Sequence, residues 1–126
     1  MKLFSALLGN SATVPAEELY KKYAKLLIEG EVIHIGFKLI RDTFMFTDKR
    51  IILIDVQGLT GSKVAYRSIA YRSISKFSVE TAGTFDLDAE LKIWVSSETQ
   101  PSITKQFNKS VDVYEVQKIL ASFVLK

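Results

Sequence analysis

The sequence of 126 residues contains no cysteine and only one histidine, one tryptophan and two prolines. Without cysteine the chain can form neither a disulfide framework nor a thiolate zinc site. The single histidine, His34, has no second histidine or cysteine with which to build a zinc site or a catalytic triad. We therefore expect no cofactor and no catalysis, and we expect His34 to lie at a surface or an interface.

The sequence also lacks long apolar runs and a strong excess of charge. No apolar run approaches the ~20 residues that a helix needs to cross a bilayer. The opening segment has an apolar core only from Leu3 to Leu8, which is too short for a signal peptide. Lysine and arginine number 17 against 14 acidic residues and are scattered along the chain, whereas nucleic-acid binders concentrate them on one face. We therefore expect a cytoplasmic protein that binds no nucleic acid and does not enter a membrane.

The length predicts one domain, with an N-terminal helical extension over residues 1–30 and the main domain over residues 31–126. The extension carries helix signals between Pro15 and Ile28. Pro15 suits a first helical turn, and acidic residues follow it there. Gly30 provides a stop after the helix. One face of this helix is apolar at helical spacing, through Leu19, Tyr20, Tyr23, Leu26 and Leu27.

Beyond residue 30 the apolar period changes to two, which is typical of strands. Short turns between consecutive strands predict an antiparallel sheet, and a sheet of this size must bend into a sandwich or barrel to bury its apolar face. A C-terminal helix follows Ser110, a good N-cap, with Val113, Val116, Ile119, Leu120 and Phe123 as its apolar stripe. The fold class is therefore mainly β with helices, and the predicted strands are residues 31–39, 43–47, 50–56, 63–69, 74–81, 89–97 and 102–107.

Two features of the strands point to an interface. The run Ile51–Ile54 is apolar at every position, so both of its faces must be covered. One face meets the core, and the other, with Ile52 and Ile54, meets the N-terminal helix or another subunit. Trp94 points outward if its neighbours Ile93 and Val95 point inward. A surface tryptophan often marks an interface, although a loop or the N-terminal helix covering it is the alternative.

Three acidic residues at spacing two, Asp86, Asp88 and Glu90, would share one face of a strand. An EF-hand loop starts with acids at this spacing, but it needs glycine at the sixth position and glutamate at the twelfth. Leu91 and Ser97 stand there instead, so we expect no metal site. A solvated turn, or salt bridges to a neighbouring subunit, is the interpretation that we favour for Asp86 and Asp88.

The block Phe77–Leu91, with the sequence FSVETAGTFDLDAEL, is long and unusual. Together with several shorter segments it resembles the bacterial pleckstrin-homology (PH) domains of the single-domain type, over essentially the whole chain. Ala70 departs from the pattern, since proline is expected before Tyr71. The shorter segments that carry the resemblance are Leu7–Asn10, Gly30–Glu31, Phe46–Arg50, Gln57–Gly61 and Tyr71–Ile74.

The resemblance implies a bent seven-stranded antiparallel barrel capped by the C-terminal helix. It also implies a non-enzymatic domain that assembles head to tail into a cyclic ring, for which a pentamer is our expectation. A hydrophilic surface where strands of neighbouring subunits meet is then the expected site for an unidentified protein partner. Trp94, Ile52, Ile54, Asp86 and Asp88 are the candidate interface residues.

The alternative function is a peripheral membrane module that binds lipid headgroups. Related domains that bind phosphoinositides use a basic residue at the end of the first strand, and Lys38 and Arg41 loosely match that position. They also use a basic pair in the second strand, but residues 43–47 contain no basic residue. Scattered charges do not make a convergent phosphate site, so protein–protein interaction is the function that we favour.

Overall fold

The computed structural model describes residues 13–39, 41–81, 89–107 and 111–126. These residues form a strand, a helix, seven further strands and a second helix, with short 3-10 turns between some of them. They fall into two compact units, one up to Ala70 and the other from Tyr71 onward. Each unit contains one antiparallel sheet and one α-helix.

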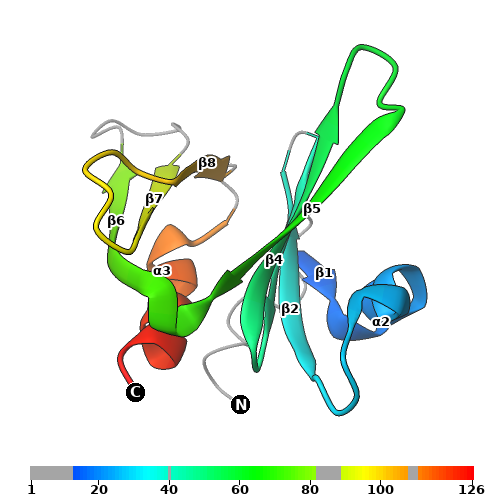
Figure 1. Cartoon of the computed structure of the whole chain (residues 1–126), viewed down its shortest axis with the longest axis horizontal. Helices are drawn as coiled ribbons and strands as arrows, with labels where there is room; N and C mark the ends of the chain where they lie inside the picture. The colour runs from blue at the N-terminus through cyan, green and yellow to red at the C-terminus, as the bar shows by residue number, and fades with distance from the viewer. Residues whose placement is uncertain (1–12, 40, 82–88, 108–110) are drawn as a thin grey trace. The chain divides into compact units, whose positions relative to one another are not determined.

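The first unit contains a five-stranded sheet in the order β1-β2-β3-β4-β5 (Figure 1). Short turns join β2 to β3 and β3 to β4, as the sequence predicts. The three-residue β1 is an addition to the predicted strands, and its Val14 lies opposite Gly36 of β2. A segment this short contains too few residues for a period of two to be recognised. The five strands are Thr13–Pro15, Ile33–Lys38, Thr43–Thr47, Arg50–Gln57 and Lys63–Ala70.

Helix α2 (Ala16–Tyr23) covers one face of this sheet. Leu19 is buried against Met45, Ile52 and Ile54, and the other predicted face residues pack around this cluster. The apolar face is therefore confirmed, but the α-helix is shorter than the predicted range of residues 15–28. A 3-10 turn over Ala24–Leu26 replaces its last turn.

Gly36 is required where α2 approaches the sheet. A Cβ atom at this position would lie 2.7 Å from Cδ1 of Leu19 and 3.4 Å from Cβ of Met45. Leu19 is 1% exposed, so its side chain has little space into which to move. Glycine therefore sets how closely the helix packs on β2.

The change Gly36→Ala should lower the free energy of unfolding by about 1–3 kcal/mol, since overpacking a filled core forces side chains away from preferred rotamers. Urea denaturation measures this loss. In a Leu19→Ala background the same change should cost less, because the atom that clashes is gone. An equal cost in both backgrounds would show that the clash with Leu19 is not the cause.

The second unit contains the three-stranded sheet β6-β7-β8 and helix α3. The predicted stripe of α3 is confirmed, because Val116, Ile119 and Leu120 are fully buried. Phe123 is half-buried and stacks on Tyr71 with ring centroids 4.7 Å apart. Asp112 caps the helix by accepting a hydrogen bond from the Tyr114 N–H, whereas the predicted cap, Ser110, lies outside the described residues. The bounds are Ile74–Thr81 for β6, Ala89–Val95 for β7, Ile103–Phe107 for β8 and Val113–Val124 for α3.

The predicted fold class is confirmed: the chain is mainly β, with two antiparallel sheets, an N-terminal helix and a C-terminal helix. The structure adds β1 and places the sheet edges, which the sequence pattern does not reveal. No helix within the described ranges is long and apolar enough to span a bilayer.

Candidate interaction surfaces

Trp94 lies on the outer face of β7, as its alternation with apolar neighbours predicts. Leu91 and Ile93 are fully buried, whereas Lys92 and Trp94 are partly exposed. Across the strand pair, Lys76 of β6 lies opposite Trp94. The Lys76 ammonium is 4.2 Å from the centroid of the indole ring, which is a cation–π contact. The indole Nε1–H is hidden from solvent and has no hydrogen-bond acceptor.

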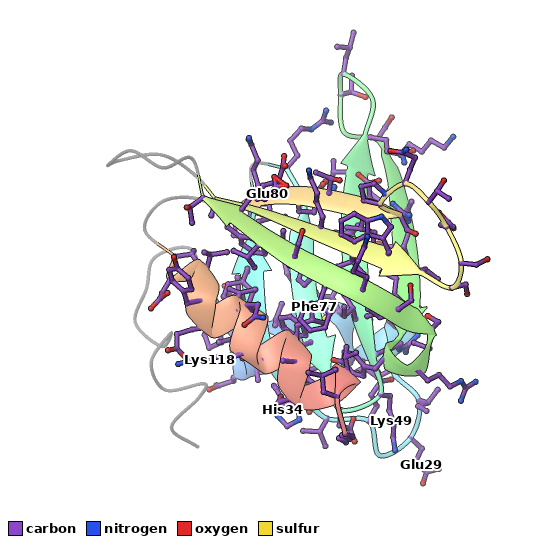
Figure 2. All side chains as sticks on the ribbon, turned by 90° about the vertical axis from the view of Figure 1, so that its left-hand side faces the viewer. Glu29, His34, Lys49, Phe77, Glu80 and Lys118 are labelled. Atoms are coloured by element: carbon purple, nitrogen blue, oxygen red, sulfur yellow. The ribbon has the colours of Figure 1, made fainter. Side chains whose placement is uncertain are left out.

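The same face continues into a group of ion pairs centred on Lys92. Its ammonium lies 2.8 Å from Oε1 of Glu80 and 3.6 Å from Oε1 of Glu90. The hydrogen bond that Lys92 donates to Glu80 is the main cause that raises the pKa of Lys92, with the charges of both carboxylates adding to it. Figure 2 labels Glu80, the β6 member of this group. The positive charge of Lys92 is therefore balanced by the two carboxylates within the sheet.

Lys76 and Arg72 differ from Lys92, because both are exposed and neither pairs with a carboxylate among the described residues. Arg72 lies in the 3-10 turn Tyr71–Ser73 that precedes β6. Beside Trp94, Lys76 thus carries a positive charge that no carboxylate of the described residues pairs with.

Of the three acidic residues at spacing two, the structure describes only Glu90. Asp86 and Asp88 lie outside the described residues. Glu90 is the third member of that series, and it pairs with Lys92. In the part of the chain that the structure describes, no three histidine, cysteine or acidic side chains are grouped closely enough to hold a metal ion.

Ile52 and Ile54 do not offer a surface to a partner. They are 1% and 4% exposed, and they belong to the cluster that packs against Leu19 of α2. The sequence allowed this face to be covered either by the N-terminal helix or by another subunit. The structure shows that the helix covers it. This placement removes both residues from the candidate interface.

Lys38 and Arg41 do not converge on one site. The Arg41 guanidinium donates a hydrogen bond to the carbonyl oxygen of Gly58, which anchors the turn between β4 and β5. Lys38 lies at the end of β2, where it lines a cavity of about 260 Å³ together with Glu18 and Lys22 of α2. A carboxylate thus shares the cavity with the two ammonium groups.

Strand β5 lies at an edge of the five-stranded sheet. The sequence predicts the strand but not its position at the edge. It pairs with β4 along its whole length without a bulge, and no other strand of the described residues pairs with its second side. Val64 and Tyr66 are 38% and 53% exposed. Figure 1 shows the β4–β5 hairpin extending past the turn between β2 and β3. Val64 and Tyr66 alternate along the strand and are both exposed. The order of strands in a sheet cannot be predicted from such a local pattern.

Glu31 and Arg50 form a buried ion pair that ties the segment after α2 to the sheet. The Glu31 side chain is fully buried, and Arg50 approaches it with Nε 2.9 Å from Oε2 and Nη2 2.9 Å from Oε1. The Thr47 hydroxyl donates to the same carboxylate at 2.6 Å, and Arg50 Nη2 also donates to the Leu26 carbonyl at 2.7 Å. The hydrogen bonds from Arg50 are the main cause that lowers the pKa of Glu31 to about 2, against the opposing effect of burial.

His34 is half-buried in β2. It lies where the pairing of β2 with β3 shifts by one residue, between Ile33 and Ile35. It is not part of a group of potential metal ligands among the described residues. The expectation that His34 is neither a metal ligand nor a catalytic base stays a prediction.

Comparison with known proteins places this arrangement in a family. Residues 2–124 match the model of the bacterial PH domain. The uncharacterized protein YjqA of Bacillus subtilis (strain 168) is 51% identical over 122 residues, which cover 97% of this chain and 98% of that protein. Among solved structures, the pleckstrin homology domain from Shewanella amazonensis SB2B has a TM-score of 0.80 and 45% identity, covering 97% of this chain and 98% of its own.

A second solved structure has the same relationship to this chain. The DUF1696 family protein with a pleckstrin-homology domain from Shewanella loihica PV-4 has a TM-score of 0.81 and 46% identity, over 92% of this chain and 98% of its own. The match spans both sheets and both helices rather than a single motif. This chain is therefore a member of the bacterial PH-domain family.

Proposed function

We propose that this chain is a non-catalytic PH-domain module that assembles with copies of itself into a cyclic ring and binds another protein. The observation that carries the proposal is the edge of β5 around the exposed Val64 and Tyr66, which pairs with no second strand among the described residues. A long, regular edge strand presents unpaired backbone N–H and C=O groups to any other strand. Proteins usually protect such an edge with proline, with bulges or by covering it.

The other sheet edges among the described residues are less suited to pairing. Strand β1 has three residues and ends at Pro15, and β6 has an irregular register between Ile74 and Lys76. Strand β8 has five residues. One strong edge that meets a different surface of the next copy gives a head-to-tail contact, which either closes into a ring or grows into a fibre. A closed ring, with a pentamer as the preferred size, removes the edge without uncontrolled growth.

A non-catalytic role is consistent with the side chains of the described residues, which form no recognisable reaction centre. A nucleophile needs a base within hydrogen-bond reach, and a general acid or base needs a pKa near the working pH. Glu31 has a strongly lowered pKa, and its carboxylate accepts hydrogen bonds from Arg50 and Thr47. Headgroup binding through Lys38 and Arg41 lacks a convergent pair, since Arg41 is bonded to Gly58.

Light scattering coupled to size-exclusion chromatography tests the assembly. The wild type should elute as one species several times heavier than the 14.2 kDa monomer. The double variant Val64→Lys/Tyr66→Lys should be monomeric, because charges directed from an edge strand block pairing with a second strand. Both positions are exposed, so the variant should keep its circular dichroism spectrum.

Tyr114→Lys is the matched control, since Tyr114 is 65% exposed on α3 and lies on no strand. This variant should retain the mass of the wild type. A wild type that remains at the monomer mass across micromolar concentrations would contradict self-assembly. A β5 variant that still assembles would leave self-assembly intact but would place the contact elsewhere.

A further inference from the structure

We infer that the face of β6–β8 around Trp94 binds an acidic, extended segment of a partner protein. The inference rests on the proposed interaction function and specifies the chemistry of its ligand. It is carried by Trp94, by Lys76 on its ring and by the unbalanced positive charge beside them.

Trp94 has the properties of an anchor residue in an incomplete interface. Aromatic side chains with a polar handle are enriched where one protein binds another. The indole Nε1–H is hidden from solvent without an acceptor, which is an unfavourable state for a polar group. The Lys76 side chain lies over the ring, and a lysine side chain is flexible.

The charges on this face favour a negatively charged ligand. Lys92 is already paired with Glu80 and Glu90, so it contributes no free positive charge. Lys76 and Arg72 are exposed without a carboxylate partner among the described residues. A carboxylate bound there would face the Lys76 ammonium, whereas a basic segment would meet it as a like charge.

The spacing of the side chains favours a ligand in an extended conformation. Lys76 and Ser78 of β6 lie on the same face at a separation of two residues, opposite Trp94 and Lys92 of β7. Side chains at this period match those of another extended chain. An extended segment with acidic residues at alternate positions, lying across β6 and β7, fits this spacing.

Trp94 is the only tryptophan in the chain, so its fluorescence reports on this face alone. The probe is a short soluble peptide of alternating glutamate and threonine, titrated into the wild-type protein. We expect a saturable change in the intensity or wavelength of Trp94 emission that weakens as salt is added, since salt screens exposed charges. The counterpart with alternating lysine and threonine should produce no such change.

Lys76→Gln removes the proposed carboxylate partner and should weaken binding of the acidic peptide about fivefold, the loss expected for one exposed charge pair. Lys118→Gln, an exposed lysine of α3, is the matched control and should bind as the wild type does. The inference is overturned if the acidic peptide leaves the emission unchanged, if both peptides bind equally, or if Lys76→Gln has no effect. The mass measured by light scattering is independent of these results, so a failure here does not count against self-assembly.

Discussion

Replacing Arg50 by methionine should lower the free energy of unfolding by about 3–5 kcal/mol at neutral pH, the usual cost of breaking a buried ion pair by removing one partner. The Glu31 carboxylate would remain in a fully buried position without its main counter-charge. The Leu26 carbonyl would lose its guanidinium donor as well. Methionine keeps most of the aliphatic stem of the side chain, so the loss reports on the charge and its hydrogen bonds. Urea denaturation followed by circular dichroism gives the value.

The pH dependence separates this effect from a general packing defect. The pKa of Glu31 is about 2 in the folded protein against an ordinary value of 4.5. A lowered pKa means that the stabilisation is complete above 4.5 and is lost as the pH falls towards 2, with a total of about 3 kcal/mol. Without Arg50, burial raises the pKa of Glu31, and protonation at low pH then relieves the unpaired charge. The difference between wild type and variant should therefore shrink on acidification, and a constant difference would contradict this account.

Lys118→Gln is a suitable control for the ion-pair prediction. The Lys118 ammonium lies 3.4 Å from Oε1 of Glu115 on α3, and the lysine side chain is 61% exposed. An exposed lysine in such a pair contributes little to stability. The control should therefore unfold close to the wild-type midpoint over the same pH range.

The change Leu120→Ala should cost about 2–5 kcal/mol, because it removes a fully buried side chain and leaves a cavity in a packed region. Leu120 belongs to the stripe of α3 that packs in the second unit together with Val116 and Ile119. Leu125→Ala is the matched control, since Leu125 is 72% exposed just beyond the helix. The control should change stability by less than about 0.5 kcal/mol. Similar values for the two variants would mean that α3 does not bury its apolar stripe.

Much of the fold follows from local patterns. The bounds of β3 and β6 agree with the predicted ranges, since turn residues and a period of two define them. The stripe of α3 was equally clear, because its apolar residues recur at helical spacing. The outward position of Trp94 followed from simple alternation along β7. These features depend on residues that are close together in the sequence.

The remaining features depend on residues that are far apart in the sequence. Helix α2 ends before Ile28 in a region where Arg50 binds the Leu26 carbonyl, and no local pattern reveals that contact. The assignment of Ile52 and Ile54 to an interface failed because a short helix covers them. Tyr66 is exposed on β5, which has β4 as its single neighbour among the described strands, and no local pattern reveals that order. Asp86 and Asp88 stay predictions, since they lie outside the described residues.

The strand order described for the two sheets has a consequence for the kinetics of folding. Among the described strands, every neighbour in either sheet is the next strand along the chain. Apart from the connection between β1 and β2, which contains α2, the loops between these neighbours are short, so little chain entropy is lost as each hairpin closes. The five-stranded sheet can therefore begin to pair on the ribosome while the segment beyond Ala70 is still being synthesised.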